Sequence, residues 1–364
     1  VSKESLIVSD GKNKKIYRDF KSIFPVCIGK ASVDMGNSAS SILKDLKKKT
    51  SEGIIIVNKE NFQELDGYKC FYSGHPIPDD NGLMAAKFLE KKLNALDERA
   101  LVLFFLSGGG SSLLPYPISN IKLSEKVKLN HSLLNSGANI KEINIVRKHL
   151  SKIKGGNLLK MSFPAKVHSF ILSDVIGDDL SSISSGPTVP DKSTFRDVIT
   201  ILEKYSLWDT APSSIKSHIE QGLNSPELET PDNKNIIFTN SNNTLIGSNN
   251  LCLESILNLC KSKKIESKIW KNNLEGDVEV LAKKFSEDIK NYQNSKSLVL
   301  ISGGESTVKI KGGGKGGRNQ EFALHFLKNV NKSIPNLKFT MLSAGTDGRD
   351  GPTDAAGAIV NDKT

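Results

Sequence analysis

The sequence predicts an α/β protein with two domains, and three observations lead to this. Short apolar runs alternate with longer stretches of helical periodicity along most of the chain, the pattern of a largely parallel sheet covered by helices. A chain of 364 residues is long enough for two hydrophobic cores. Residues 224–234 are polar and carry Pro226 and Pro231, which is typical of a linker. We therefore expect domains at residues 1–230 and 231–364.

The alternation in the first half indicates a three-layer, Rossmann-like domain with helices on both faces of its sheet. The strands expected there are Val26–Ile28, Ile54–Val57, Leu101–Leu106 and Val167–Leu172. Amphipathic helices are expected at Asn81–Leu96 and at Ser124–Ser136, where Ser124 is a favourable N-cap residue. The second half is expected to form another three-layer α/β domain, with strands at Asn235–Thr239, Ile265–Trp270, Leu298–Ile301, Thr307–Lys311 and Phe339–Ser343.

Composition narrows the classes of function. The net charge of +10 includes lysine clusters such as residues 261–264, without interleaved aromatic residues, so we expect solvated faces and no nucleic-acid partner. No apolar run approaches the roughly 18 residues of a membrane span. No pattern of a secretory signal is seen, and the four cysteines form no metal-binding pattern. We expect a cytoplasmic protein without a membrane partner, and a homodimer is the oligomer considered.

A glycine-rich turn follows the strand expected at Leu101–Leu106. Glycine has no Cβ, so backbone N–H groups can approach an anion closely, and serine hydroxyls add further donors. We interpret the turn as a cofactor-binding loop. The alternative is a tight strand-to-helix turn without a ligand. The loop residues are Ser107, Gly108, Gly109, Gly110 and Ser111.

A shorter version of this pattern recurs in the second half, where Leu298–Ile301 leads into Ser302, Gly303 and Gly304. Ligands of open α/β sheets bind beyond the carboxyl ends of the strands. Both turns are therefore expected at a binding site, which indicates a cleft between the two domains. Gly303 and Gly304 are expected to contact the cofactor.

The segment 312–321, with the sequence GGGKGGRNQE, is the strongest local signal. It contains the spacing GxGxxG, but no acidic residue lies about 20 residues further on, where a dinucleotide-binding fold holds the ribose. We interpret it as a basic loop that leads Arg318 and Asn319 into a helix at Glu321–Lys328, an arrangement that suits a polyphosphate. The alternative is a flexible hairpin. The expected cofactor contacts are Gly314, Gly316, Gly317 and Asn319.

Acidic residues gather in two further loops. The loop that begins at Asp174 holds three carboxylates within six residues, and a cation would offset their repulsion. Mg²⁺ binds one or two carboxylates and keeps its waters, so this loop is interpreted as a metal site, with a solvated N-cap cluster as the alternative. A second acidic run, residues 345–354, includes Asp347.

Two single residues complete the candidates. Lys30 follows the first expected strand, where an ammonium group can reach a phosphate, although a surface lysine is the ordinary alternative. His75, in the segment GHPIPD, is interpreted as a turn histidine rather than as a catalytic group.

Taken in order, these segments resemble the glycerate 2-kinase family, whose C-terminal part is a MOFRL-type domain. The matching segments are residues 28–31, 74–79, 106–111, 144–156, 173–179, 185–191, 302–305, 316–321 and 344–357. They cover nearly the whole chain. The resemblance implies ATP-dependent phosphorylation of D-glycerate at the 2-hydroxyl, which gives 2-phosphoglycerate and ADP, assisted by Mg²⁺ in a cleft between the domains.

The resemblance also implies roles for five residues. Lys30, Asp174 and Arg318 are expected to be catalytic. Lys30 and Arg318 would neutralise phosphate oxygens or the glycerate carboxylate, and Asp174 would bind metal or accept the hydroxyl proton. Glu305 and Asp347 are expected to join Asp174 as metal ligands.

Two departures from the family pattern and two rival functions are also part of this interpretation. Cys27 stands where the family's Gly-x-Gly-Lys turn has its first glycine, and we expect the MOFRL-type domain to lack its final segment after Thr364. An NAD(P)H-dependent hydroxypyruvate reductase, a label that members of this family have often carried, is the first rival. A non-enzymatic nucleotide- or nucleic-acid-binding module is the second.

Overall fold

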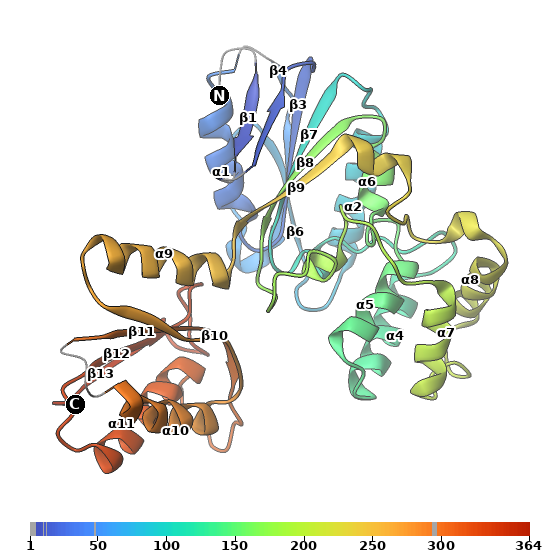
Figure 1. Cartoon of the computed structure of the whole chain (residues 1–364). Coiled ribbons are helices and arrows are strands. Elements are labelled where there is room, and N and C mark those ends of the chain that lie inside the picture. Colours follow the sequence, from blue (N-terminus) through green and yellow to red (C-terminus); the bar gives the residue numbers. More distant parts are fainter. Residues whose placement is uncertain (1–4, 10, 12, 47–48, 293–296) are drawn as a thin grey trace. The chain divides into compact units, whose positions relative to one another are not determined.

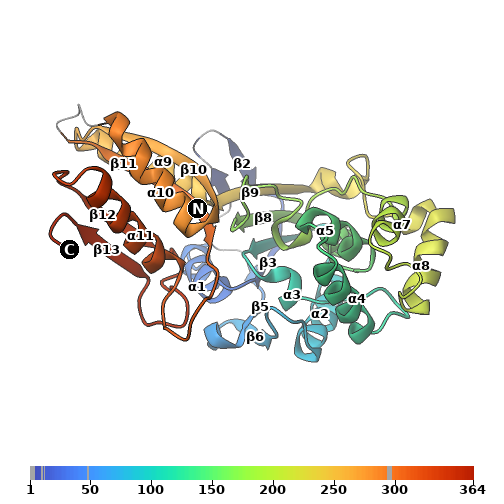
Figure 2. The ribbon, with the colours of Figure 1, turned by 90° about the horizontal axis from the view of Figure 1, so that it is seen from below.

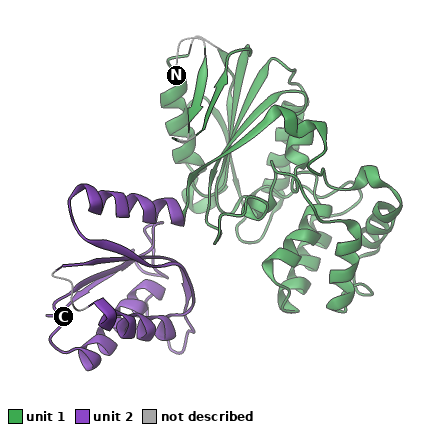
Figure 3. Cartoon of the chain, in the orientation of Figure 1, with its two compact units in different colours: residues 1–248 green, residues 249–364 purple. Residues whose placement is uncertain are grey.

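The computed structural model describes residues 5–9, 11, 13–46, 49–292 and 297–364. The chain forms two compact units, Val1–Ser248 and Asn249–Thr364 (Figures 1 and 3). The boundary was expected after residue 230. The unit boundary lies further along because β9 (Ser241–Gly247) pairs with β8 (Lys166–Leu172), a strand of unit 1.

Unit 1 is built on a parallel sheet with the strand order β6-β5-β3-β7-β8-β9, and β4 pairs with β3 beside this path. Every one of these pairings is parallel. This confirms the α/β class and the large parallel sheet. The strands not yet introduced are β3 (Ser22–Ile28), β4 (Lys49–Thr50), β5 (Gly53–Asn58), β6 (Tyr68–Ser73) and β7 (Ala100–Leu106).

The six strands of this path follow the order 3-2-1-4-5-6 when they are counted along the chain. Strand order therefore reverses between β3 and β7, which lie side by side in register from Ser22 to Ile28 and from Ala100 to Leu106. In doubly wound sheets, ligands bind outside the carboxyl ends of the strands at this reversal. The topology alone points to the loops that follow Ile28 and Leu106.

Apolar side chains fill both faces of the sheet because strands buried on two sides need no polar alternation. Ile54 and Ile56 of β5 pack in one core cluster, and Ile55 and Val57 pack in the other. The first face is covered by α2 (Asp80–Leu93) and α6 (Asn157–Ser162), as Figure 1 shows. The second is covered by α1 (Ser32–Leu43) and the hairpin of β1 (Leu6–Ser9) and β2 (Lys14–Tyr17).

Four helices of unit 1 form a core of their own beside the sheet (Figure 2). Phe195, Ile143 and Leu133 are among its fully buried side chains. Two of these helices begin at well-capped residues: Asn139 accepts hydrogen bonds from the Lys141 and Glu142 N–H groups, and Thr194 accepts one from the Asp197 N–H group. They are α4 (Leu123–Asn135), α5 (Ile140–His149), α7 (Phe195–Lys204) and α8 (Ser213–Asn224).

The segment that was expected to be a linker packs on this helical core. It contains η3 (Pro226–Leu228), and the Glu229 carboxylate accepts hydrogen bonds from the N–H group of Phe195 at 3.0 Å and lies 3.0 Å from His149 Nε2. The Thr230 hydroxyl donates to Asp191 at 3.0 Å. The linker prediction was wrong because these polar groups bind other parts of unit 1.

Unit 2 is a smaller α/β unit. Strands β10 (Ser267–Asp277) and β11 (Val299–Thr307) pair in parallel, and β12 (Thr340–Ala344) and β13 (Gly357–Asn361) pair antiparallel. Its core joins Phe326 and Val330 to Met341 and Val360. The helices are α9 (Asn249–Ser262), α10 (Val278–Asp288) and α11 (Arg318–Ser333), with the short η5 (Ile289–Tyr292).

Several local predictions were wrong. Residues 236–240 form η4 (Ile236–Asn240), a 3₁₀ helix, and the strand begins only at Ser241. Helix α4 begins after Lys122, and Ser124 is not its N-cap. Strand β11 runs through Gly303 and Gly304 to Thr307, so the second Ser-Gly-Gly segment is part of a strand and not a turn. None of the helices in the described ranges is long and apolar enough to cross a bilayer.

Candidate active site

The loops after β3 and β7 are joined by backbone hydrogen bonds at the point where the strand order reverses. The Ser107 N–H donates to the Ile28 carbonyl at 2.9 Å, and the Lys30 N–H donates to the Gly108 carbonyl at 2.9 Å. Gly29 has a φ of 127°, and a Cβ at this position would overlap Ser107. This glycine allows the close approach of the two loops.

The three glycines of the loop after β7 each leave room for a side chain from another segment. A Cβ on Gly108 would overlap the Asp174 carboxylate, and a Cβ on Gly110 would overlap the Ser184 hydroxyl. Gly109 has a φ of 85°, a conformation that favours glycine, and precedes the short α3 (Gly110–Leu113). The loop therefore exposes its backbone to side chains that come from the ends of other strands.

Lys30, His75 and Asp174 surround this loop. A Cβ on Gly109 would lie 3.0 Å from His75 Cδ2 and 3.4 Å from Lys30 Cγ. Lys30 follows β3, His75 follows β6, and Asp174 follows β8, so three parallel strands deliver them to one edge of the sheet. The structure thus brings together two residues that the sequence predicts to be catalytic and one histidine that was expected to be a turn residue.

The segment that carries His75 is fixed by the N-cap residue of α2. The Asp79 carboxylate accepts hydrogen bonds from the Gly82 N–H at 3.0 Å and from the Ser73 hydroxyl at 3.2 Å, which fixes both ends of the segment that carries His75. Burial, and then the charge of Lys30, lower the pKa of the imidazole below its usual value of 6.5. His75 also lines a hollow of about 350 Å³ with Lys59 and Tyr72.

Asp174, Lys30 and His75 are available for a ligand. Their side chains form no hydrogen bond or ion pair with any residue in the described ranges. Asp174 and Lys30 are solvent-exposed, and His75 is partly buried. A carboxylate, an ammonium and a neutral imidazole around an anion-compatible loop can bind a phosphate, a hard cation and a hydroxyl group.

The two serines of the loop have structural partners. The Ser107 hydroxyl is buried and accepts a hydrogen bond from the Ala31 N–H at 3.1 Å. The Ser111 hydroxyl lies 3.0 Å from that of Ser185, and the Ser111 carbonyl accepts a hydrogen bond from Lys154 Nζ at 2.6 Å. Both serines therefore shape the loop.

In unit 2, Arg318 and Glu305 are brought together. Arg318 Nη1 lies 2.5 Å from Glu305 Oε1, and the side chains are 43% and 58% exposed. Asp347 lies in the loop after β12, where its carboxylate accepts a hydrogen bond from the Arg349 N–H at 3.2 Å. Among the residues that the structure describes, no three His, Cys, Asp or Glu side chains gather as a metal site.

The N-terminus of α11 is already occupied by a carboxylate. Asp350 is buried, and it accepts hydrogen bonds from the N–H groups of Asn319 at 2.9 Å and Gln320 at 2.8 Å. A Cβ on Gly317 would overlap Asp350. Asp350 thus satisfies two of the backbone N–H groups at this helix terminus, and the expected contact of Asn319 with a polyphosphate stays a prediction.

The other predicted glycines of unit 2 differ in their surroundings. A Cβ on Gly303 would overlap the Asn249 side chain, and a Cβ on Gly304 would overlap the backbone of Leu274. These two glycines are required by packing inside unit 2. In contrast, a Cβ on Gly314 or Gly316 would meet no atom within 4 Å, so packing around the Cβ position does not require glycine there.

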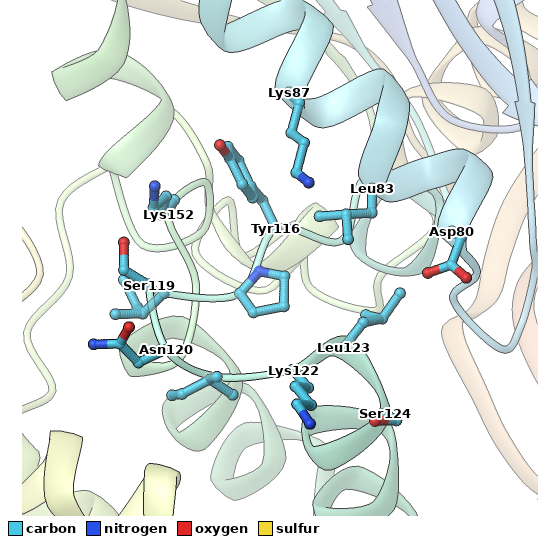
Figure 4. A pocket seen from close by; sticks show the side chains of 13 residues that line it. Asp80, Leu83, Lys87, Tyr116, Ser119, Asn120, Lys122, Leu123, Ser124 and Lys152 are labelled. Carbon is cyan, nitrogen blue, oxygen red and sulfur yellow. The ribbon is translucent and has the colours of Figure 1, made fainter.

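A separate pocket of about 560 Å³ lies beside α2 (Figure 4). Figure 4 shows Leu83 and Lys87 of α2 in the upper part of the view, with Tyr116 to the left of Lys87 and with Lys122 and Leu123 below. None of the sequence-predicted site residues lines this pocket. It is not part of the candidate active site.

Comparison with known proteins covers both units. Residues 2–220 match a family described as a domain of unknown function (DUF4147), and residues 298–364 match the MOFRL family. A glycerate 2-kinase of Pyrococcus horikoshii is 37% identical over 350 residues, which is 94% of this chain and 76% of the relative. A D-glycerate 2-kinase of Thermotoga maritima is 38% identical over 346 residues, with coverage of 93% and 78%.

Two solved structures are similar in fold. A crystal structure of a Pyrococcus horikoshii protein matches with a TM-score of 0.83 and 35% identity, and covers 98% of this chain and 81% of that one. The crystal structure of a glycerate kinase from Thermotoga maritima matches with a TM-score of 0.81 and 36% identity, and covers 94% and 80%.

Proposed function

This chain belongs to the glycerate 2-kinase family, and we propose that it transfers the γ-phosphoryl group of ATP to the 2-hydroxyl of D-glycerate, with Mg²⁺. The observation that supports a site in unit 1 is the glycine loop at the reversal of strand order, surrounded by Lys30, His75 and Asp174. The 2-hydroxyl oxygen attacks the γ-phosphorus, the bond from the γ-phosphorus to the bridging oxygen breaks, and ADP leaves.

Phosphoryl transfer depends on positioning and on charge neutralisation. Lys30 is exposed beside the loop and has no carboxylate partner within the described residues, so its ammonium can neutralise oxygens of the transferred phosphate. The missing Cβ atoms of Gly108 and Gly109 let the Asp174 and His75 side chains approach the loop backbone beside Lys30. We assign the same task of neutralisation to Arg318 in unit 2.

Asp174 is the residue whose chemistry fits Mg²⁺. Its carboxylate is exposed and accepts no hydrogen bond from the described residues, and Mg²⁺ takes one or two carboxylates together with waters and phosphate oxygens. When bound, Mg²⁺ neutralises the charge of the phosphate oxygens. Glu305 and Asp347 stay proposed as further ligands. Glu305 would have to give up part of its contact with Arg318.

The proton of the 2-hydroxyl needs an acceptor. His75 is suited to this task because its pKa lies below 6.5, so the imidazole is neutral at pH 7 and can accept a proton. We therefore propose His75 as the general base, with Asp174 as the alternative acceptor. General base catalysis typically contributes about 10²–10⁴-fold to a rate.

A coupled assay with the purified chain tests the function. D-glycerate with Mg-ATP is expected to release ADP, and the product is expected to feed enolase directly, which requires the 2-phosphate. Hydroxypyruvate with NADH is expected to show no oxidation of NADH. ADP release with a product that needs a mutase before enolase would contradict the 2-position, and oxidation of NADH would favour a reductase.

Three finer predictions belong to this proposal. We infer that unit 2 is a MOFRL-type domain with three layers, that unit 1 is Rossmann-like, and that the protein forms a homodimer.

Light scattering of the purified chain tests the homodimer, and a mass equal to one chain would contradict it.

A further inference from the structure

Three basic side chains of unit 1 form a cluster that the proposed reaction does not yet use. Lys126 lies on α4, Arg147 lies on α5, and Lys154 lies in the loop between α5 and α6. Lys126 is 4% exposed and Lys154 is 2% exposed, while Arg147 is partly buried. We call Lys126, Arg147 and Lys154 the basic cluster.

The basic cluster has no acidic partner among the described residues. Lys126 Nζ donates to the Leu150 carbonyl at 3.0 Å, and Lys154 Nζ donates to the Ser111 carbonyl at 2.6 Å. The Arg147 guanidinium forms no hydrogen bond or ion pair with the described part of the chain. By contrast, the buried Lys148 pairs with Asp191 at 3.1 Å. A buried cation is costly without such a partner.

Each member of the basic cluster also disfavours the charged form of its neighbours. Burial, and then the charge of Arg147, lower the pKa of Lys126 to about 7. Burial, and then the charges of Lys126 and Arg147, hold the pKa of Lys154 well below its usual range. Burial lowers the pKa of Arg147. An anion bound among them would remove both the repulsion and part of the desolvation cost.

The basic cluster lies beside the glycine loop. Lys154 contacts Ser111, the last residue of that loop, and the Ser111 hydroxyl is 3.0 Å from the Ser185 hydroxyl. Ser185 in turn donates to Asn144 at 3.0 Å, and Asn144 precedes Arg147 by three residues, which places both on one face of α5. A hydrogen-bonded network thus joins the basic cluster to the proposed catalytic loop.

We propose that the basic cluster binds the carboxylate of the hydroxy acid that this kinase phosphorylates, an inference that rests on the proposed function. A guanidinium presents two parallel donors to a carboxylate, and the bound carboxylate favours the protonated forms of the two lysines, which then add charge. In a 2-hydroxy acid, the reacting hydroxyl is on the carbon next to the carboxylate. A carboxylate site adjacent to the glycine loop therefore selects the 2-hydroxyl for transfer.

Arg147→Met tests the proposal, because Arg147 is partly exposed and unpaired, so that the variant should fold. The KM for D-glycerate is expected to rise by about 10–100-fold, while the KM for ATP changes less than about twofold. Arg147→Lys should recover part of the loss. Lys141→Met, on the exposed side of the same helix, is the matched control and should leave both constants unchanged.

Calorimetry without nucleotide separates this proposal from the proposed function. D-glycerate should bind the parent chain at least about tenfold more tightly than it binds Arg147→Met or Lys154→Met. The uncharged glyceramide should bind none of the three chains tightly. This holds even if the parent chain releases no ADP, an outcome that would overturn the kinase function alone. A rise in the KM for ATP rather than for D-glycerate, or equal binding of D-glycerate by all three chains, would overturn the carboxylate site.

Discussion

At the scale of single residues, His75 is the group whose removal should be most informative. It lies over Gly109, and burial lowers its pKa below 6.5. In the parent chain, kcat/KM should fall as the pH drops through this pKa, since the base becomes protonated. His75→Gln should lower kcat by about 10²–10⁴-fold and abolish this acidic limb. Steady-state kinetics between pH 5 and 9 measure both effects.

The control for His75→Gln is His131→Gln, since His131 is an exposed histidine on α4. It should keep the rate and the pH profile of the parent chain. A variant at position 75 that retains both the rate and the acidic limb would remove His75 from the mechanism and leave Asp174 as the proton acceptor.

Arg318 should matter for turnover and little for stability. Its only ion pair in the described ranges is with Glu305, and both side chains are roughly half exposed, so the pair is worth at most about 1 kcal/mol. An arginine that stabilises transferring phosphate can contribute about 10³-fold or more. Arg318→Ala should therefore reduce kcat by about that factor and keep the unfolding midpoint. Arg196→Ala, on the exposed face of α7, should change neither. If Arg318→Ala kept an activity within a fewfold of the parent, Arg318 would be excluded from the mechanism.

The sequence could predict the residues that sit directly after strands. Lys30, Gly108 and Asp174 were found because an apolar run shows where a parallel strand ends, and such ends share one edge of the sheet. His75 was set aside, since nothing in the sequence shows that its segment returns to Gly109. The capping of the helix that carries Asn319 could not be predicted, because Asp350 is distant in the chain.

At the scale of elements, α11 depends on a cap from another loop. The Asp350 carboxylate is buried and accepts three hydrogen bonds from Asn319 and Gln320. Asp350→Ala removes these acceptors and the favourable charge at the helix N-terminus, so it should destabilise unit 2 by about 1–3 kcal/mol. Urea unfolding followed by circular dichroism measures this. The exposed Asp354→Ala should cost less than about 0.5 kcal/mol. Equal losses in the two variants would contradict the capping role.

Strand β8 carries a buried histidine that should make stability depend on pH. His168 Nδ1 lies 2.7 Å from the Tyr17 hydroxyl, Nε2 lies 2.9 Å from the Thr244 hydroxyl, and burial lowers the pKa to about 4. The unfolded chain takes up this proton near pH 6.5, but the native chain does so only near pH 4. The stability that the neutral imidazole of His168 gives the native chain is therefore complete above pH 6.5. As the pH falls to 4, the free energy of unfolding decreases by on the order of 2–3 kcal/mol.

His168→Gln should be less stable than the parent at pH 7, and the difference should shrink as the pH falls from 6.5 to 4. Urea unfolding at several pH values gives this difference, and the other titrating groups cancel because both chains share them. A constant difference across the window would show that the imidazole is protonated in the native sheet.

Elements were predictable where their pattern was long. The runs around Ile54 and Leu103 became β5 and β7, because seven or fewer consecutive apolar residues between polar ends suit a strand buried on both faces. The short run Ile236–Phe238 was ambiguous and became part of η4. Strand β6 was not predicted, since Lys69 interrupts its apolar pattern at the edge of the sheet.

At the scale of the whole molecule, each unit has its own hydrophobic core. Three clusters lie in unit 1, and the cluster around Phe326 belongs to unit 2. The chain also has two tryptophans, one in each unit. Trp208 packs on the helical core of unit 1, and Trp270 packs on Phe285 with its Nε1 donating to Asp288 at 2.9 Å. Fluorescence can therefore follow the two units separately.

Phe326→Ala should lower the stability of unit 2 selectively. The side chain is 1% exposed and contacts Phe285 and Phe339, so its truncation should cost about 3–5 kcal/mol. With Trp208→Phe in the background, the Trp270 signal should show a midpoint that falls by this amount. With Trp270→Phe instead, the Trp208 signal should keep its midpoint to within about 0.5 kcal/mol, because its core lacks Phe326. A fall of both midpoints by the same amount would show that the two cores unfold as one cooperative body.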